Sequence, residues 1–193
     1  METFQQSSAK VGETLLNGIF AHIPLFMMLV DVEGRIEKLS RSLSNLYGKT
    51  PEKGVMVRGG DIFRCIHHLD SPKGCGFGPA CRTCGIRRTI LDTLETGAPH
   101  YKVKAELKSI NNPKHARHLL ISTAPVYFRE KKALVFVEDI TDEINSRSAL
   151  KEQKDFFHAL LETISNPIFY KDAQGRYTGC NKAFENFIGK SRS

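Results

Sequence analysis

Residues 31–49 read DVEGRIEKLSRSLSNLYGK, and residues 172–190 read DAQGRYTGCNKAFENFIGK. The two stretches align without a gap, share Asp, Gly, Arg, Asn, Gly and Lys at matching positions, and mostly agree in their apolar positions. Upstream, IPLF at 23–26 is echoed by NPIF at 166–169. A single repeat with such a long spacing indicates tandem copies of one domain rather than a solenoid.

Each copy predicts the same local structure. In the first copy, an apolar strand over 25–32 runs into an Asp-x-x-Gly turn. The side chain of Asp31 caps such a turn, and Gly34 supplies the positive φ that it needs. A second strand over 35–39 and a short amphipathic helix over 41–47 complete the unit.

The segment after the cysteine-rich stretch adds one helix and three strands. The helix is expected over 86–96, where four apolar residues share one face. Strands are expected over 101–110, 118–128 and 133–139, with turns at 111–114 and 130–132. This order of elements predicts an α+β domain built on a five-stranded antiparallel sheet.

Four segments therefore divide the chain. We expect an N-terminal helix over 1–21, a complete domain over 22–142 with a cysteine-rich insertion at 65–84, a linker helix over 143–165, and the start of a second domain over 166–193. The second copy contains only two strands and one helix, so its sheet would leave an apolar face open. We expect it to be completed either by residues beyond Ser193 or by a segment from elsewhere.

The linker has a partial heptad pattern. Leu150, Phe157 and Ile164 recur every seventh residue, but Arg147 and Lys154 interrupt the seam. The pattern fits equally a helix packed on its own domain and a parallel two-chain linker. Because the N-terminal helix also carries an apolar stripe, we expect the protein to form a homodimer through these helices.

Composition excludes several classes of protein. The chain has 193 residues, of which 40% are hydrophobic and 25% charged, as in an ordinary globular protein. It has no apolar run long enough to span a membrane and no secretory signal, so we expect a cytoplasmic protein. The net charge of +7 comes from 28 Lys and Arg spread among 21 Asp and Glu. That dispersion does not indicate binding to nucleic acid.

The chain gathers soft metal ligands in one stretch. Four of its five cysteines lie within twenty residues, in the order Cys65, Cys75, Cys81 and Cys84. Glycines and a proline between them let the backbone wrap tightly, and a Cys-x2-Cys pair before a helix is a common metal-binding turn. Thiolates suit zinc and iron–sulfur clusters. Disulfides, a thiol redox switch and plain loop residues remain alternatives.

Neighbouring residues leave the ligand set open. Cys65 lies beside an apolar stripe of helical spacing, Ile62, Ile66 and Leu69, so burial in the core is the alternative to its expected role as a ligand. In that case His67 or His68 would replace it in a Cys3His zinc site. Cys180 aligns with an inward-facing strand position of the first copy and is expected to be a core residue.

The repeat unit and the VEDITD segment at 137–142 resemble those of PAS domains, and NPIFYKDAQGRY at 166–177 is similar to the start of a sensory-box PAS domain. The resemblance covers about 15–142 and 156–193. It implies a five-stranded antiparallel sheet with helices on one face. It also implies signal reception upstream of an output domain such as a histidine kinase of a two-component system, a cyclic-di-GMP enzyme or a transcriptional activator.

The resemblance also bears on the bound group. In PAS domains the region of the cysteine insertion lines the ligand pocket, and some PAS-containing sensor kinases carry an oxygen-labile iron–sulfur cluster on four cysteines. It therefore implies such a cluster on the four clustered cysteines. One alternative is a module with a structural zinc site or a small-molecule pocket that serves mainly dimerisation, and another is the sensor part of a DNA-binding regulator. For the bound group, haem is a further alternative. No catalytic motif is present, so we expect a sensory segment rather than an enzyme.

Overall fold

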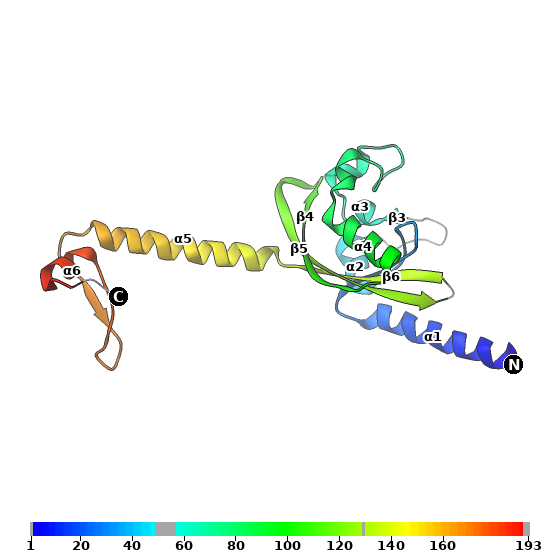
Figure 1. Cartoon of the computed structure of the whole chain (residues 1–193), viewed down its shortest axis with the longest axis horizontal. Coiled ribbons are helices and arrows are strands. Elements are labelled where there is room, and N and C mark those ends of the chain that lie inside the picture. The colour runs from blue at the N-terminus through cyan, green and yellow to red at the C-terminus, as the bar shows by residue number, and fades with distance from the viewer. Residues whose placement is uncertain (1, 49–56, 129, 191–193) are drawn as a thin grey trace. The chain divides into compact units, whose positions relative to one another are not determined.

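The computed structural model describes residues 2–48, 57–128 and 130–190 (Figure 1). These residues form two compact units, Met1–Thr141 and Asp142–Ser193. Lys49, the first-copy partner of the last lysine in the repeat, lies outside the described residues. No helix in the described part of the chain is long and apolar enough to cross a membrane.

One antiparallel sheet forms the centre of the first unit. Its strands are β1 (Phe26–Val30), β2 (Arg35–Leu39), β3 (Val57–Arg58), β4 (His100–Ser109), β5 (Asn112–Phe128) and β6 (Glu130–Asp139). They pair in the order β3-β2-β1-β6-β5-β4. The predicted α+β fold is confirmed. The two-residue β3 adds a sixth strand at the edge beside β2, which the sequence did not indicate.

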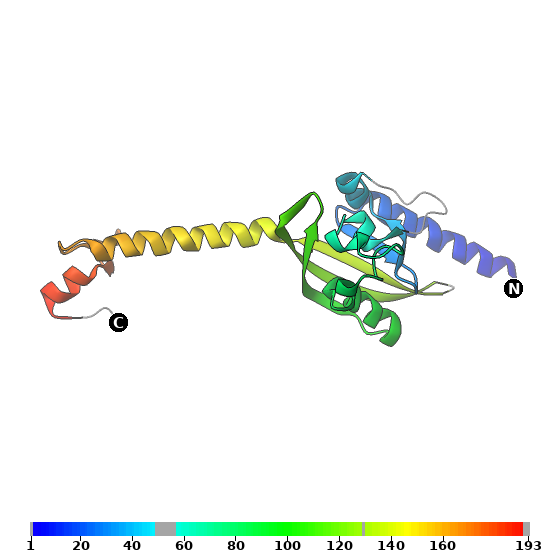
Figure 2. The same cartoon turned by 90° about the horizontal axis from the view of Figure 1, so that it is seen from above.

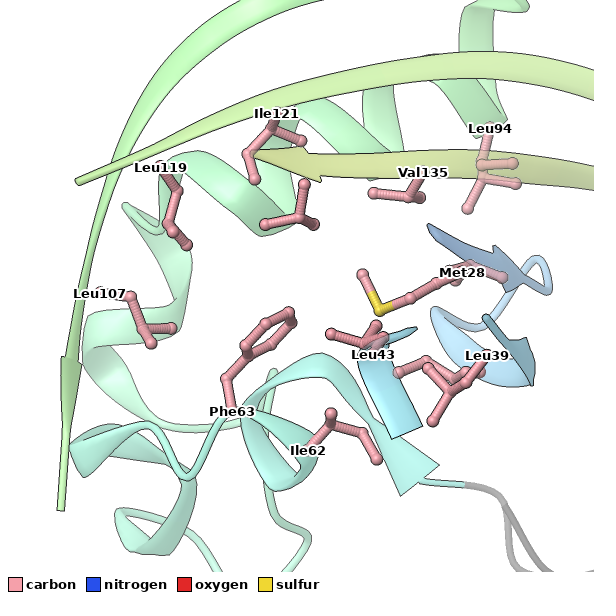
Figure 3. Close-up of a cluster of buried hydrophobic side chains, with 14 residues drawn as sticks. Met28, Leu39, Leu43, Ile62, Phe63, Leu94, Leu107, Leu119, Ile121 and Val135 are labelled. Carbon is pink, nitrogen blue, oxygen red and sulfur yellow. The ribbon is translucent and has the colours of Figure 1, made fainter. Parts of the chain in front are cut away.

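Helices and turns cover the inner face of this sheet. They are α2 (Arg41–Tyr47), α3 (Gly59–Ile62), the 3-10 turns η1 (Ile66–Leu69) and η2 (Pro79–Arg82), and α4 (Gly85–Thr96). Figure 3 shows the core between the two layers, where side chains from α2, α3 and α4 meet those of β1, β4, β5 and β6. Met28, Leu43, Ile62, Ile121 and Val135 are almost completely inaccessible to solvent.

A separate helix covers the outer face. Figures 1 and 2 show α1 (Glu2–His22) on the side of the sheet opposite α3 and α4. Phe20 of α1 packs with Met27 and Leu29 of β1 in a second, smaller apolar cluster, with Leu134 and Phe136 at its margin. The first unit thus has three layers: the inner helices and turns, the sheet, and α1, which buries outward-facing residues of β1 and β6.

The strand boundaries differ from the predictions at both hairpins. Residues 130–132, expected as a turn, belong to β6, and the β5–β6 ladder continues as far as the pair Phe128 and Glu130. The β4–β5 hairpin is also tighter than predicted, because Ser109 pairs with Asn112. In both hairpins, cross-strand pairing extends into residues whose composition suggested a loop, with a register shift between Lys108 and Ser109 in the β4–β5 hairpin.

The Asp-x-x-Gly turn forms as predicted in both copies. Asp31 Oδ1 accepts hydrogen bonds from the amides of Glu33 and Arg35 at 2.9 and 2.8 Å. Asp172 Oδ1 accepts from the amides two and four residues later at 3.0 and 2.9 Å. The glycine of each turn has a φ of 77°. The repeated residues therefore encode the same turn twice.

The second unit is a helix followed by a hairpin and a short helix. Its elements are α5 (Thr141–Thr163), β7 (Phe169–Lys171), β8 (Tyr177–Cys180) and α6 (Lys182–Ile188). Two aromatic residues of the hairpin, Phe169 and Tyr177, stack with Phe184 of α6, with ring centroids 4.9 to 5.9 Å apart. Cys180 ends β8 and is only half-buried.

A buried asparagine joins the parts of this unit. Asn181 is inaccessible to solvent, and its Oδ1 accepts hydrogen bonds from the amides of Ile168 and Phe184 at 2.9 and 3.0 Å. Its Nδ2 donates to three carbonyls at 3.2, 3.0 and 2.9 Å: Leu161, Ile164 and Asn166. One side chain therefore ties the end of α5, the start of the hairpin and the start of α6 together.

Ser40 occupies the matching position in the first copy. Its Oγ donates to the carbonyl of Leu25 at 2.7 Å and accepts from the amide of Met27 at 3.1 Å. A separate hydroxyl, that of Ser42, donates to the carbonyl of Ile23 just after α1, at 3.0 Å. Two serines of the first copy thus hold β1 and the segment that follows α1. In the second copy, one asparagine makes the corresponding contacts.

Replacement of Asn181 should loosen the second unit. Asn181→Ala leaves two amides and three carbonyls without their buried partner, so we expect the free energy of unfolding of this unit to fall by roughly 2–4 kcal/mol. Hydrogen–deuterium exchange of peptides covering 161–184 in the whole chain measures the loss. Asn186→Ala, on the exposed side of α6, is the control. Equal protection in both variants would contradict this role.

Candidate functional site

The segment between α3 and α4 folds around a sharp bend that the sequence did not reveal. The helix predicted from Ile62, Ile66 and Leu69 does not form, because α3 ends at Ile62 and Arg64 has a left-handed φ of 50°. Cys65 instead forms an isolated β-bridge with a residue of β4. Leu69 is 71% exposed, so the predicted stripe was wrong.

The loop that follows brings the remaining cysteines back toward the sheet. Gly74 and Gly76 adopt φ values of 78° and 98°, which place the chain in the left-handed region on both sides of Cys75. Cys81 lies in η2, and Cys84 is the N-cap residue of α4. The predicted Cys-x2-Cys turn before a helix is therefore present.

All four clustered cysteines line a single cavity of about 510 Å³, here called the cysteine cavity. Much of its wall is apolar, formed by residues of the sheet, α3 and α4: Met28, Phe63, Ile86, Ile90, Leu91 and Leu107. His67 and His68 also reach this wall. Cys180 belongs to the second unit and is not a lining residue.

Backbone amides point at three of the four sulfurs. The amide of Gly76 donates to Cys81 Sγ at 3.2 Å. Backbone hydrogen bonds from Gly60 and His67 act on the thiols of Cys75 and Cys65. Because N–H donors stabilise negative charge on sulfur, this arrangement suits thiolates better than neutral thiols.

Burial opposes that effect in the metal-free chain. Desolvation raises the pKa of the Cys65 thiol, and it raises the pKa of Cys75 to about 11, although the backbone hydrogen bonds act in the opposite direction. At neutral pH, Cys75 is therefore a protonated thiol. A metal that binds here must displace its proton, so metal binding should be favoured by higher pH.

The two histidines of the wall are each held by a carboxylate. His67 Nδ1 lies 2.8 Å from Asp70 Oδ2, and His68 Nδ1 lies 3.2 Å from Asp61 Oδ1. This is the arrangement in which a carboxylate orients an imidazole for a metal on its other nitrogen. His67 and His68 therefore remain possible substitute ligands.

The described side chains form no ready-made site for a single metal ion. Zinc requires its sulfur ligands about 2.3 Å from one point. Over residues 2–48, 57–128 and 130–190, no three His, Cys, Asp or Glu side chains are placed to hold a metal ion. The four cysteines instead line a larger cavity whose wall is mostly apolar.

The exit from the first unit is fixed by a short network. The backbone of His118 in β5 accepts from the amide of Ile140 and donates to Thr141 Oγ1, both at 2.9 Å. The carboxylate of Asp139 accepts from both the amide and the hydroxyl of Thr141. The Asp-Ile-Thr segment thus anchors the start of α5 to the sheet.

Sequence reasoning missed two residues of the cavity wall, Arg58 and Arg87. Neither belongs to a recognisable motif, and both were counted only as part of a dispersed positive charge. Only the folded chain places them beside the cysteines. A basic residue three positions after Cys84, on the same helix, was the single available signal.

Comparison with known proteins agrees with this geometry. Residues 155–193 match the sequence model described as PAS domain. The first unit has the α+β fold that the sequence predicts, an antiparallel sheet with helices on its inner face. A comparison with curated proteins gives no match.

Several solved structures are similar to the chain. A PAS domain of a protein from Colwellia psychrerythraea is 15% identical, with 67% of this chain and 97% of that chain covered and a TM-score of 0.46. The PAS domain of nitrogen regulation protein NR(II) from Vibrio parahaemolyticus is 12% identical, with 65% and 98% covered and a TM-score of 0.46. The PAS domain of Bordetella pertussis BvgS is 14% identical, with 75% and 98% covered and a TM-score of 0.44.

Two adjacent glycines of α3 provide a matched test of the packing. A Cβ added to Gly60 would lie 2.6 Å from Cys75 Sγ, whereas one added to Gly59 meets nothing within 4 Å. We expect Gly60→Ala to lower the free energy of unfolding by about 1–3 kcal/mol because Cys75 must move. Gly59→Ala should leave it unchanged or raise it by up to about 1 kcal/mol.

Urea unfolding of the reduced, metal-free chain measures both variants. Alkylation of Cys75, followed by mass spectrometry, reports whether this thiol becomes more accessible in Gly60→Ala alone. Equal stability and equal alkylation in the two variants would show that Cys75 does not pack on Gly60.

Proposed function

We propose that this chain is a signal-sensing PAS module in which the four clustered cysteines hold an iron–sulfur cluster, and that loss or oxidation of the cluster is the signal. The observation that carries the proposal is the cysteine cavity. The four cysteines that line it come from four different elements: a β-bridge, a loop, the 3-10 turn η2 and the N-cap of α4. Backbone N–H groups act on three of their sulfurs. A bound cluster supplies a redox centre sensitive to oxygen.

The chain's own residues would control access to such a centre. Apolar side chains of the sheet, α3 and α4 form much of the wall and limit contact with water. N–H donors to the sulfurs and limited solvent access are the features through which proteins tune a cluster's potential. The loop between Cys75 and Cys84 carries the exposed Phe77.

The relay to an output domain is proposed to run through β4 and β5. Glu106 of β4 lies in the cavity wall and pairs across the ladder with His118 of β5. The backbone of His118 holds Ile140 and Thr141 at the start of α5. A change in the wall at β4 would thus act on the exit helix. The second copy and a cytoplasmic output enzyme, such as a histidine kinase, would follow.

A small-molecule sensor is the second candidate. A largely apolar cavity of about 510 Å³ is within the size range of ligand pockets, and it needs no metal to be filled. In that case the cysteines would serve as small apolar wall residues. Zinc remains a structural alternative that would require the sulfurs to draw together onto one point.

Anaerobic purification decides among these. We expect the whole chain to show broad absorption near about 400 nm and to contain iron and inorganic sulfide. Cys75→Ser should lose both, because it removes a ligand from the middle of the set. Cys180→Ser is the matched control in the second unit and should keep both.

The other outcomes each overturn the proposal. A colourless chain with one zinc that Cys75→Ser abolishes makes the site structural. A chain with neither iron nor zinc, even after reconstitution with iron and sulfide, leaves the thiols or a small molecule as the sensing group. Loss of iron in Cys180→Ser as well would place the metal outside the cysteine cavity.

We also propose that the protein is a homodimer. On α1, Leu15 and Ile19 are 64% and 42% exposed, although the opposite side of the helix packs on the sheet. A second copy would cover this stripe. Leu15→Glu should shift the mass measured by light scattering from dimer to monomer, whereas Glu13→Gln should not. A monomeric wild type at high concentration would contradict the proposal.

A further inference from the structure

Two guanidinium groups pack against the loop that carries half of the clustered cysteines. Arg87 stands in the first turn of α4, and its Nη1 lies 2.6 Å from the position that a Cβ at Gly76 would occupy. The Arg58 guanidinium lies 4.7 Å from the ring centroid of Phe77. Both arginines also line the cysteine cavity. Two positive charges are therefore built into the wall beside the sulfurs.

Neither charge is compensated within the described residues. Arg58 donates from Nη2 to the carbonyl of Glu33 at 3.1 Å, but its Nε is buried without a hydrogen-bond partner. The Arg87 side chain has no hydrogen bond or ion pair in the part of the chain that the structure describes. A half-buried guanidinium without an anion is unfavourable, because it has lost water and gained little in return.

The nearby carboxylates are engaged elsewhere. Asp61 and Asp70 hydrogen-bond to the two cavity histidines. Glu106, the acidic residue of the cavity wall, faces His118 across the ladder with 3.8 Å between Oε1 and Nδ1. No described carboxylate forms an ion pair with either arginine. An anion bound in the cavity would supply a negative charge to both arginines.

We infer that Arg58 and Arg87 are the counter-charges of an anionic thiolate complex formed by the four clustered cysteines. The inference rests on the proposed function, because it presupposes a metal or cluster on these sulfurs. Four thiolates carry twice the charge that a divalent ion neutralises, so the complete site is an anion. The two guanidinium groups lie where they stabilise that anion without coordinating the metal.

Two consequences separate this role from simple packing. Removal of either positive charge weakens the metal complex, because the anion loses its partner. In the metal-free chain the same removal relieves an uncompensated charge, so stability stays the same or increases. For a bound cluster, loss of a nearby positive charge also disfavours the reduced, more negative state and lowers the midpoint potential.

Anaerobic reconstitution of the reduced, metal-free whole chain with iron and sulfide, followed by competition with an iron chelator, tests the first consequence through loss of the cluster absorption at about 400 nm. We expect Arg87→Gln and Arg58→Gln each to weaken retention of the cluster by about 10- to 100-fold, as outer-shell substitutions do. Arg88→Gln removes the same formal charge from an exposed position of α4 and should change the retention by less than about twofold.

Urea unfolding of the metal-free variants and redox titration of the reconstituted chain complete the test. The glutamine variants should be at least as stable as wild type when metal-free. A cluster in Arg87→Gln should have a midpoint potential lower by about 60 mV, a tenfold change for one electron. A wild type that takes up no iron and sulfide overturns the proposed function and this inference together.

Two other outcomes overturn this inference alone. In the first, wild type holds the cluster and both glutamine variants hold it equally well. In the second, the glutamine variants hold it more weakly but are also less stable when metal-free, which would make the arginines packing residues.

Discussion

Burial of the inner face of the sheet is the constraint on which the cysteine cavity depends. The segment that carries the cysteines is anchored at both ends by side chains that complete the core. Ile62 and Phe63 fix its start, and Leu94 fixes the helix at its end. Because both anchors pack on the same sheet face, the chain between them must return on itself. Hydrophobic burial, without any metal, therefore brings the sulfurs to one cavity.

Local patterns predicted the parts of the fold that local interactions determine. The bounds of β2 and α2 agree with those expected from the sequence, because both elements lie beside turns closed by neighbouring residues. Asp31 caps its turn within four residues, and Ser40 caps α2. The repeat carried the same information twice, so the hairpin and helix of the second unit followed from the first. The gathering of the cysteines was likewise visible in their spacing.

What the sequence did not reveal depends on residues distant along the chain. The stripe from Ile62 to Leu69 has helical spacing, yet the β-bridge of Cys65 with Ser109 takes the chain away from a helix at Arg64. The place of Arg58 in the wall follows from its position at the edge strand β3, where tertiary packing sets it beside the loop. The spacing of residues along the chain predicts neither of these contacts.

The close approach of Gly60 to Cys75 also has a consequence for how sequences of this kind change over evolution. The space above the Gly60 Cα is filled by the sulfur of a residue fifteen positions later. A lineage that keeps a cysteine at position 75 therefore requires glycine at position 60. A lineage that replaces this cysteine with a smaller residue can accept a side chain at position 60. Substitutions at the two positions should therefore be correlated in natural sequences. Gly59, which faces open space, should drift independently of both.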